Sequence, residues 1–124
     1  MEMENTLIIG ILLFSLGAVI LSIASMWTIF NKAGKPGWAA IIPIYNMVIL
    51  LEVVGKPVWW IILMLIPFVN LVIIVIVYHN LSLSFGKDVG FTIGLVMLNF
   101  IFLPLLAFGD SKYLGPVGEQ NNYI

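Results

Sequence analysis

The sequence predicts an all-α integral membrane protein, a four-helix transmembrane bundle in which proline kinks the second, third and fourth helices. Of its 124 residues, 62% are hydrophobic and only 9% are charged, which is too few charges to cover the surface of a soluble domain. Four apolar stretches of about 17 to 25 residues suit a hydrocarbon core of about 30 Å. Lipid offers the backbone no hydrogen-bond partners, so these stretches are expected to be helical.

A single membrane domain, residues 1–124, accounts for the whole chain. The helices are expected at about 6–30, 38–54, 58–84 and 89–108, followed by a polar tail at 111–124. The first stretch follows an acidic start, whereas a secretory signal would begin with basic residues. This helix carries a face of small residues that favours close packing, either on the chain's own helices or on a second copy; it includes Ser15, Ala18 and Ser22.

The second and third helices repeat one pattern. Each begins with Gly-Lys-Pro, continues through tryptophan into an apolar run, and is interrupted by proline, at Pro43 and at Pro67. An asparagine follows three residues later, at Asn46 and at Asn70. Because proline removes one backbone hydrogen bond inside a helix, a kink is predicted at each of these positions.

The fourth helix carries Pro104 near its exit, where a third kink is predicted. Gly86, Gly90 and Gly94 form two overlapping G-x-x-x-G units at its start. This spacing favours close helix packing in membranes but does not specify the partner.

Uncharged polar residues occur at about the same depth in all four predicted helices. They are Ser15 and Ser22, Asn46, Asn70 and Asn99. An amide alone in hydrocarbon is costly, so these groups are expected to bond across helices. Two interpretations follow: a clasp that fixes helix register, or a small polar binding or permeation site. Counted from the turn that joins the second and third helices, Asn46 lies almost level with Leu63. Pro67 has no N–H, so the Leu63 carbonyl lacks its helical donor. We therefore predict that Asn46 donates to the backbone near Leu63.

The lysines give a weak orientation signal. Alternating spans place Lys32, Lys35 and Lys87 in the cytoplasm and Lys56 and Lys112 outside, so both termini are expected outside. Glu52 lies four residues before Lys56 and is expected to pair with it at headgroup level.

Residues of the types that form catalytic, metal-binding or nucleic-acid-binding sites are scarce. The chain contains no cysteine and one histidine, and its cations are five lysines, which speaks against a nucleic-acid surface. No G-x-S-x-G elbow, His-Glu-x-x-His pair or glycine-rich phosphate loop occurs. We therefore expect no enzyme activity, and no catalytic, cofactor-binding or metal site.

Several ordered motifs resemble one family. They are Lys32-Ala33-Gly34-Lys35, Ile42-Pro43, Tyr45-Asn46, Gly55-Lys56-Pro57, Trp59-Trp60, Ile66-Pro67 and Ser84-Phe85-Gly86-Lys87. The family is a bacterial membrane domain of unknown function that also occurs fused N-terminally to signal peptidase I, and its stand-alone members are often labelled as that peptidase. The peptidase's catalytic serine lies in a Ser-Met-x-Pro setting, whereas Ser25-Met26 is followed here by Trp27-Thr28.

The resemblance implies a multi-pass protein of the bacterial inner membrane and supplies no activity. With it, the residues favour a non-enzymatic accessory or scaffold protein that packs against another membrane protein, in protein export. The alternative is a small oligomeric carrier or channel with a polar midplane site. The implied partners are the lipid bilayer and either a second membrane protein or further copies of the chain.

Overall fold

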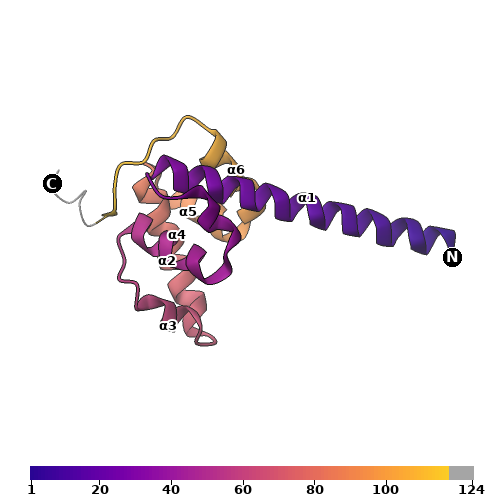
Figure 1. The fold of residues 1–124 in the computed structure, drawn as a ribbon, viewed down its shortest axis with the longest axis horizontal. Helices are drawn as coiled ribbons and strands as arrows, with labels where there is room; N and C mark the ends of the chain where they lie inside the picture. Colours follow the sequence, from indigo (N-terminus) through magenta and orange to yellow (C-terminus); the bar gives the residue numbers. More distant parts are fainter. Residues whose placement is uncertain (118–124) are drawn as a thin grey trace.

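The computed structural model describes residues 1–117, which form helices and connecting turns without a β-strand (Figure 1). The elements are α1 (Glu2–Lys32), the 3₁₀ turn η1 (Gly37–Ile41), α2 (Pro43–Val54), α3 (Trp60–Met64), α4 (Val69–Ser84), α5 (Val89–Met97) and α6 (Asn99–Phe108). The predicted helical class is confirmed, whereas the four-span bundle is not. Part of the expected polar tail, 118–124, lies outside the described residues.

Helix α1 is, within residues 1–117, the one helix long and apolar enough to cross a membrane. Its 18-residue apolar window has a mean hydropathy of 2.8 and no residue buried inside the fold. Glu2 and Glu4 in the first turn and Lys32 in the last complement the helix dipole. Figure 1 shows the N-terminal part of α1 extending away from the remaining helices.

The three other predicted helices are each divided by a reversal of the chain, so the rest of the fold consists of three hairpins. In the first hairpin, η1 and α2 pack on each other and the break falls at Ile42, whose backbone is extended (φ −93°, ψ 115°). Pro43 occupies the first turn of α2, where its missing N–H costs nothing and its φ suits the helix. The expected kink inside a helix at 38–54 is therefore corrected: Pro43 begins a helix.

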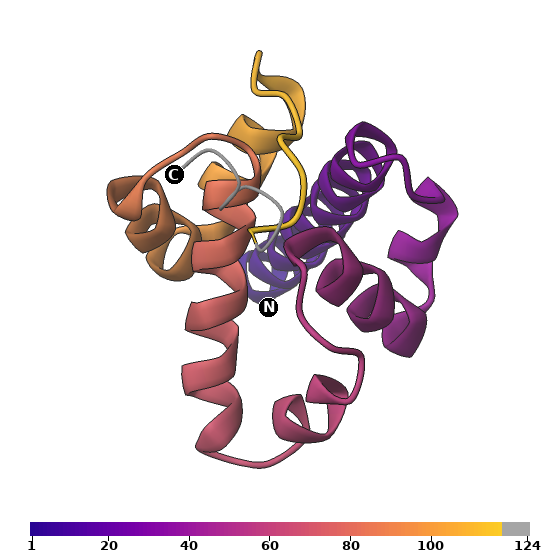
Figure 2. The same cartoon turned by 90° about the vertical axis from the view of Figure 1, so that its left-hand side faces the viewer.

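The second hairpin joins α3 to α4, which pack together (Figure 2). The predicted helix 58–84 stops at Met64 and resumes at Val69, because the residue before Pro67 is disfavoured in helical conformation. Phe68 then has a positive φ of 68°, and the Val69 N–H donates to the Pro67 carbonyl at 2.8 Å. This three-residue turn is strained for a side chain other than glycine.

The third hairpin joins α5 to α6. The break lies at Leu98 (φ −129°, ψ 55°), whereas Pro104 lies inside α6. Across the hairpin the Phe91 and Phe102 rings meet edge to face with centroids 5.2 Å apart. A Cβ on Gly94 would lie 2.3 Å from Phe102, so glycine is required for this close approach. The predicted helix 89–108 is corrected to two short helices.

The strained turn gives a testable expectation. Phe68 is 83% exposed, so replacing it changes few contacts within the fold. We expect Phe68→Gly to be more stable than Phe68→Ala by about 1 kcal/mol, because glycine relieves the backbone strain and alanine retains it. Thermal unfolding of the two purified variants in detergent checks the difference. Equal stabilities would show that the turn is not strained.

All three hairpins end at the end of the molecule where α1 also ends. The connection 55–59 leads from this end to α3, which lies beside the start of α4 (Figure 1). The Lys32 ammonium donates to the carbonyls of Leu106, Gly109 and Ser111 at 2.9–3.2 Å, which joins the end of α6 to the end of α1. The Leu114 N–H donates to the Ser84 carbonyl at 2.7 Å, which brings the end of α4 to the same place.

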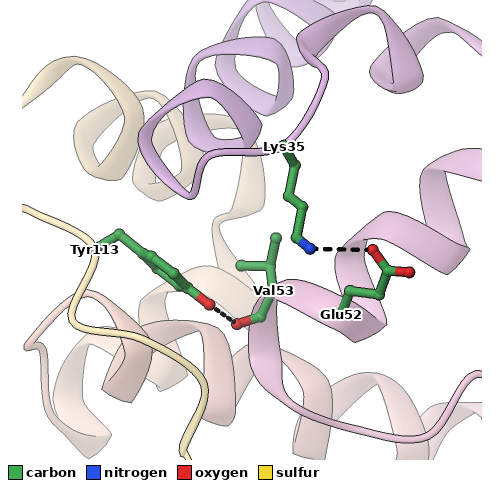
Figure 3. A network of polar contacts seen from close by, with 4 residues as sticks. All are labelled: Lys35, Glu52, Val53 and Tyr113. Carbon is green, nitrogen blue, oxygen red and sulfur yellow. Dashed lines mark hydrogen bonds and ion pairs between the residues drawn. The ribbon is translucent and has the colours of Figure 1, made fainter.

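Helix α2 ends there too. The Tyr113 hydroxyl donates to the Val53 carbonyl at 2.6 Å, and Lys35 pairs with Glu52 at 3.3 Å (Figure 3). The predicted pairing of Glu52 with Lys56 is thus corrected, and the Lys56 ammonium lies instead 5.2 Å from the Trp60 ring centroid.

We call the end of the molecule at which α1, α2, α4 and α6 finish the charged end. It contains all charged side chains of residues 5–117, namely Lys32, Lys35, Glu52, Lys56, Lys87, Asp88, Asp110 and Lys112. Lys56 and Lys112 belong to segments at the same end of the fold as Lys87, whereas the membrane sides expected for them stay a prediction.

The buried core lies next to the charged end. Most of its members come from α1, α2, α4 and α6, and they include Ile29, Phe30, Leu51, Val53, Val54, Val77, Leu81, Leu103, Leu106 and Ala107. Ala39 and Ala40 of η1 and Leu95 of α5 also contribute. The hairpin tips lie at the other ends of the hairpins and remain exposed apart from the half-buried Asn99; they are residues 41–44, 65–69 and 97–100. The fold therefore holds its hairpins at their bases and leaves their tips uncovered.

Candidate functional site

Two of the predicted midplane amides close the breaks of their own hairpins. The Asn46 side chain donates to the Ala40 carbonyl at 3.1 Å, from α2 back to η1. The Asn99 side chain donates to the Leu95 carbonyl at 3.2 Å, from α6 back to α5. A chain reversal leaves carbonyls without helical donors, and these amides supply them.

The predicted bond from Asn46 to the Leu63 carbonyl is replaced by the bond to Ala40, because the reversal at Ile42 leaves that carbonyl much nearer. Asn70 is half-buried at the start of α4. On α1, Ser22 is half-buried and Ser15 is exposed. The structure thus places the five predicted polar residues in separate settings, and within residues 1–117 no side-chain hydrogen bond joins one of them to another.

Removing either amide should destabilise its hairpin. We expect Asn46→Leu and Asn99→Leu each to lower the free energy of unfolding by about 1 kcal/mol, because a backbone carbonyl loses its donor. Asn31→Leu, at an exposed position outside the hairpin tips, is the control and should change little. Denaturant titration of the purified proteins in detergent measures the differences. If Asn46→Leu and Asn99→Leu lower the free energy of unfolding no more than Asn31→Leu does, the two amides do not stabilise the hairpins.

The predicted glycine motif does not form one helix face. Gly86 lies in the turn before α5 with a φ of +75°, and its nearest neighbour is Leu114. Gly90 is in the first turn of α5, beside the Asp88 carboxylate. Gly94 alone packs against another helix, through Phe102. On α1, Ala18 is half-buried.

A polar cluster at the α4–α5 turn is absent from the sites predicted from the sequence. Asp88 caps α5 by accepting from the Phe91 N–H at 3.2 Å, and its carbonyl accepts from Ser82 at 2.9 Å. His79 Nδ1 and Thr92 Oγ1 lie 3.0 Å apart, which links α4 to α5. The signal was the run His-Asn-Leu-Ser-Leu-Ser at 79–84, which is unusually polar for the end of an apolar helix.

Two atoms of this polar cluster lack a partner within the described part of the chain. They are Asn80 Nδ2 and Ser84 Oγ, on residues 6% and 0% exposed. The two residues are one helical turn apart on α4, so they occupy the same face. No group of three or more His, Cys, Asp or Glu that could hold a metal ion occurs among residues 1–117.

The concave surfaces are lined mainly by apolar residues, although His79 and Thr92 contribute to one on α4 and α5. A groove of about 500 Å³ runs along α1 and is lined by Ile20, Ile23, Ala24, Trp27 and Thr28. Another, of about 280 Å³, lies where α1 passes the start of α6, and its lining is Phe14, Gly17, Ala18, Leu21 and Phe100. A third, of about 180 Å³, lies between α2, α3 and α4. These grooves suit hydrocarbon or apolar side chains rather than a polar substrate.

The fold and these surfaces define an all-helical protein with one helix fit to cross a membrane and three helical hairpins joined at a charged end. The chain belongs to DUF5684, a family of unknown function, which matches residues 38–116. No curated protein and no solved structure matches it. The matched region covers the three hairpins and ends at Pro116, which packs against Gly55. The expected membership in an uncharacterised family is confirmed, whereas the expected link to signal peptidase I stays a prediction.

Proposed function

We propose that this protein is a non-enzymatic accessory protein of the bacterial cell membrane that packs against another membrane protein. The observation that carries the proposal is the uncovered part of α1. None of its 18-residue apolar window is buried inside the fold, although every other helix contributes to the core or to a hairpin. A surface this apolar requires lipid, a partner helix or both.

One face of the uncovered segment suits a helical partner. Gly10 and Gly17 are seven residues apart and therefore lie on nearly the same side of α1. A Cβ on either would meet nothing within 4 Å. Small residues on an exposed helix let a second helix approach closely and pack backbone against backbone. The groove between Gly17 and Phe100 continues this face towards the hairpins.

The alternative, a carrier or channel with a polar midplane site, has less support. Its site would need the midplane amides to face a shared, solvated space. Asn46 and Asn99 instead donate to carbonyls of their own hairpins, and the grooves described above are lined by apolar residues. The accessory function therefore has the better support.

Site-directed photo-crosslinking in living cells tests the proposal. A photoreactive phenylalanine analogue placed at Phe14, which borders the groove beside Gly17, should crosslink to one membrane protein. The same analogue at Val19, on the opposite side of α1, is the matched control and should crosslink mainly to lipid. Gly17→Val should weaken the Phe14 crosslink, because its side chain blocks close approach. The resemblance makes protein-export components the first partners to examine.

Three results would contradict the proposal. Equal crosslinking from Phe14 and Val19 would show that no particular face binds a partner. A Phe14 crosslink to a second copy of the chain would replace the accessory role with a homo-oligomer. Recovery of the chain from native membranes as a partner-free monomer, with normal protein export in a deletion strain, would remove the support for the proposal.

A further inference from the structure

We infer that the three hairpins enter the membrane from the cytoplasmic side and return to it, so that α1 alone among the described elements crosses the bilayer. The acyl chains of the cytoplasmic leaflet then surround the uncovered hairpin tips. This inference rests on the proposed residence in the membrane and adds to it the way in which the chain is embedded.

The first support is the position of the charges. The turns after α1, α2 and α4, and the segment after α6, all lie at the charged end, as the contacts of Lys32, Tyr113 and Leu114 establish. Alternating spans would place successive turns on opposite faces of a membrane. A chain whose connections between hairpins share one end can instead place all of its charges in one headgroup layer.

The second support is helix length. At about 1.5 Å per residue, the 12 residues of α2 extend about 18 Å, and the 9 and 10 residues of α5 and α6 about 14 and 15 Å. The 16 residues of α4 extend about 24 Å. All are shorter than the hydrocarbon core of about 30 Å. The 31 residues of α1 extend about 46 Å, enough to cross the core and reach both headgroup layers.

The third support is the chemistry of the tips. Their most exposed side chains are apolar: Ile44 and Leu65 are each 65% exposed, Met97 73% and Phe68 83%. Water-facing turns are normally built from polar residues and glycine, so this composition favours hydrocarbon.

The backbone of the tips also suits hydrocarbon, where unpaired N–H groups are costly. Pro43 and Pro67 carry no N–H, and the amides of Ile42, Ile66 and Leu98 each donate to a carbonyl in the same hairpin. The side chains of Asn46 and Asn99 serve carbonyls at two of the three breaks. A reversal inside a leaflet thus keeps several tip groups satisfied, although the backbone amides of Phe68 and Asn99 have no acceptor within residues 1–117.

The fourth support gives the side of the membrane. All five lysines belong to the charged end, and lysine-rich connections remain in the cytoplasm. Glu2 and Glu4 lie at the opposite end of α1. The N-terminus is therefore placed outside and the charged end in the cytoplasm, which differs from the arrangement that alternating spans predict.

Cysteine accessibility in the full chain tests this inference, and the natural chain has no cysteine to interfere. Single-cysteine variants Met3→Cys, Lys56→Cys, Lys87→Cys and Lys112→Cys are treated with a membrane-impermeant maleimide. In spheroplasts we expect only the Met3→Cys protein to react, and in inverted membrane vesicles only the other three. Met97→Cys, at a hairpin tip, should react in neither preparation until detergent dissolves the membrane.

The decisive comparison is Lys56→Cys with Lys87→Cys. Reaction of these two from opposite faces would restore alternating spans and overturn the inference, as would labelling of Met97→Cys from either face. Reaction of all three lysine-derived cysteines from outside would overturn the assignment to the cytoplasmic leaflet. If the cysteines are labelled as expected but no partner protein is crosslinked, the proposed function is refuted and the inference is not. If a partner is crosslinked but Lys56→Cys and Lys87→Cys are labelled from opposite faces, the inference is refuted and the proposed function is not.

Discussion

Replacing Lys32 with methionine is expected to lower the free energy of unfolding by about 3 kcal/mol. The Lys32 ammonium donates to three carbonyls at the end of α6 and just beyond it, and hydrogen bonds from a charged donor contribute about 1.5–3 kcal/mol. Methionine preserves the apolar stem but cannot donate, so the Gly109 and Ser111 carbonyls lose this donor, while the Leu106 carbonyl keeps its bond from the Ser111 hydroxyl. Equilibrium unfolding in detergent, followed by tryptophan fluorescence, measures the change.

The control for this prediction is Lys112→Met. Lys112 is exposed, at the same charged end, so its removal should change the free energy of unfolding by less than about 0.5 kcal/mol. Lys32→Arg retains the charge and several donors and should recover part of the loss. If Lys32→Met and Lys112→Met are equally stable, Lys32 does not hold the end of α6 to α1.

The substitution Gly37→Val should be similarly damaging, because η1 packs directly against α1 at this point. A Cβ on Gly37 would lie 2.2 Å from the Trp27 ring, and Gly37 is buried. Overpacking of this kind costs about 1–3 kcal/mol. Gly17→Val is the matched control, since a Cβ there meets nothing within 4 Å, and its unfolding should be unchanged.

The double variant Trp27→Leu/Gly37→Val distinguishes steric conflict from a general intolerance of valine. The smaller leucine should make room for the new side chain, so valine should cost less in the Trp27→Leu background than in the natural chain. The same cost in both backgrounds would show that the contact between Trp27 and Gly37 is not what makes glycine necessary.

The helical class could be predicted from composition alone, whereas the chain reversals could not. Hydropathy averages over many residues, and the residues at the breaks, such as Ile42 and Leu98, are as apolar as the helices they separate. Pro43 and Pro67 lie at breaks of the chain, but the predicted kinks inside continuous helices are replaced by a helix start at Pro43 and a turn at Pro67. Whether a proline kinks a helix or begins one depends on what the preceding segment packs against, which the sequence does not display.

The partners of the polar residues depended on these reversals. Asn46 was identified as a buried donor in need of an acceptor, and it does find a carbonyl, but Ala40 comes within reach because the chain turns at Ile42. In the same way, Glu52 reaches Lys35 because the first hairpin returns to the end of α1. Local residue patterns indicated which groups need partners, and the tertiary path of the chain determined which partners they obtain.

A spin-label distance in liposomes tests the central claim, that the hairpins share one end, most directly. The labels are attached to the double variant Lys56→Cys/Lys87→Cys, in a chain with no other cysteine. Gly55 packs on Pro116 and Gly86 on Leu114, so we predict a single distance between the two labels, well below the hydrocarbon thickness of about 30 Å. A distance of about 30 Å or more would place the two turns on opposite membrane faces and contradict it.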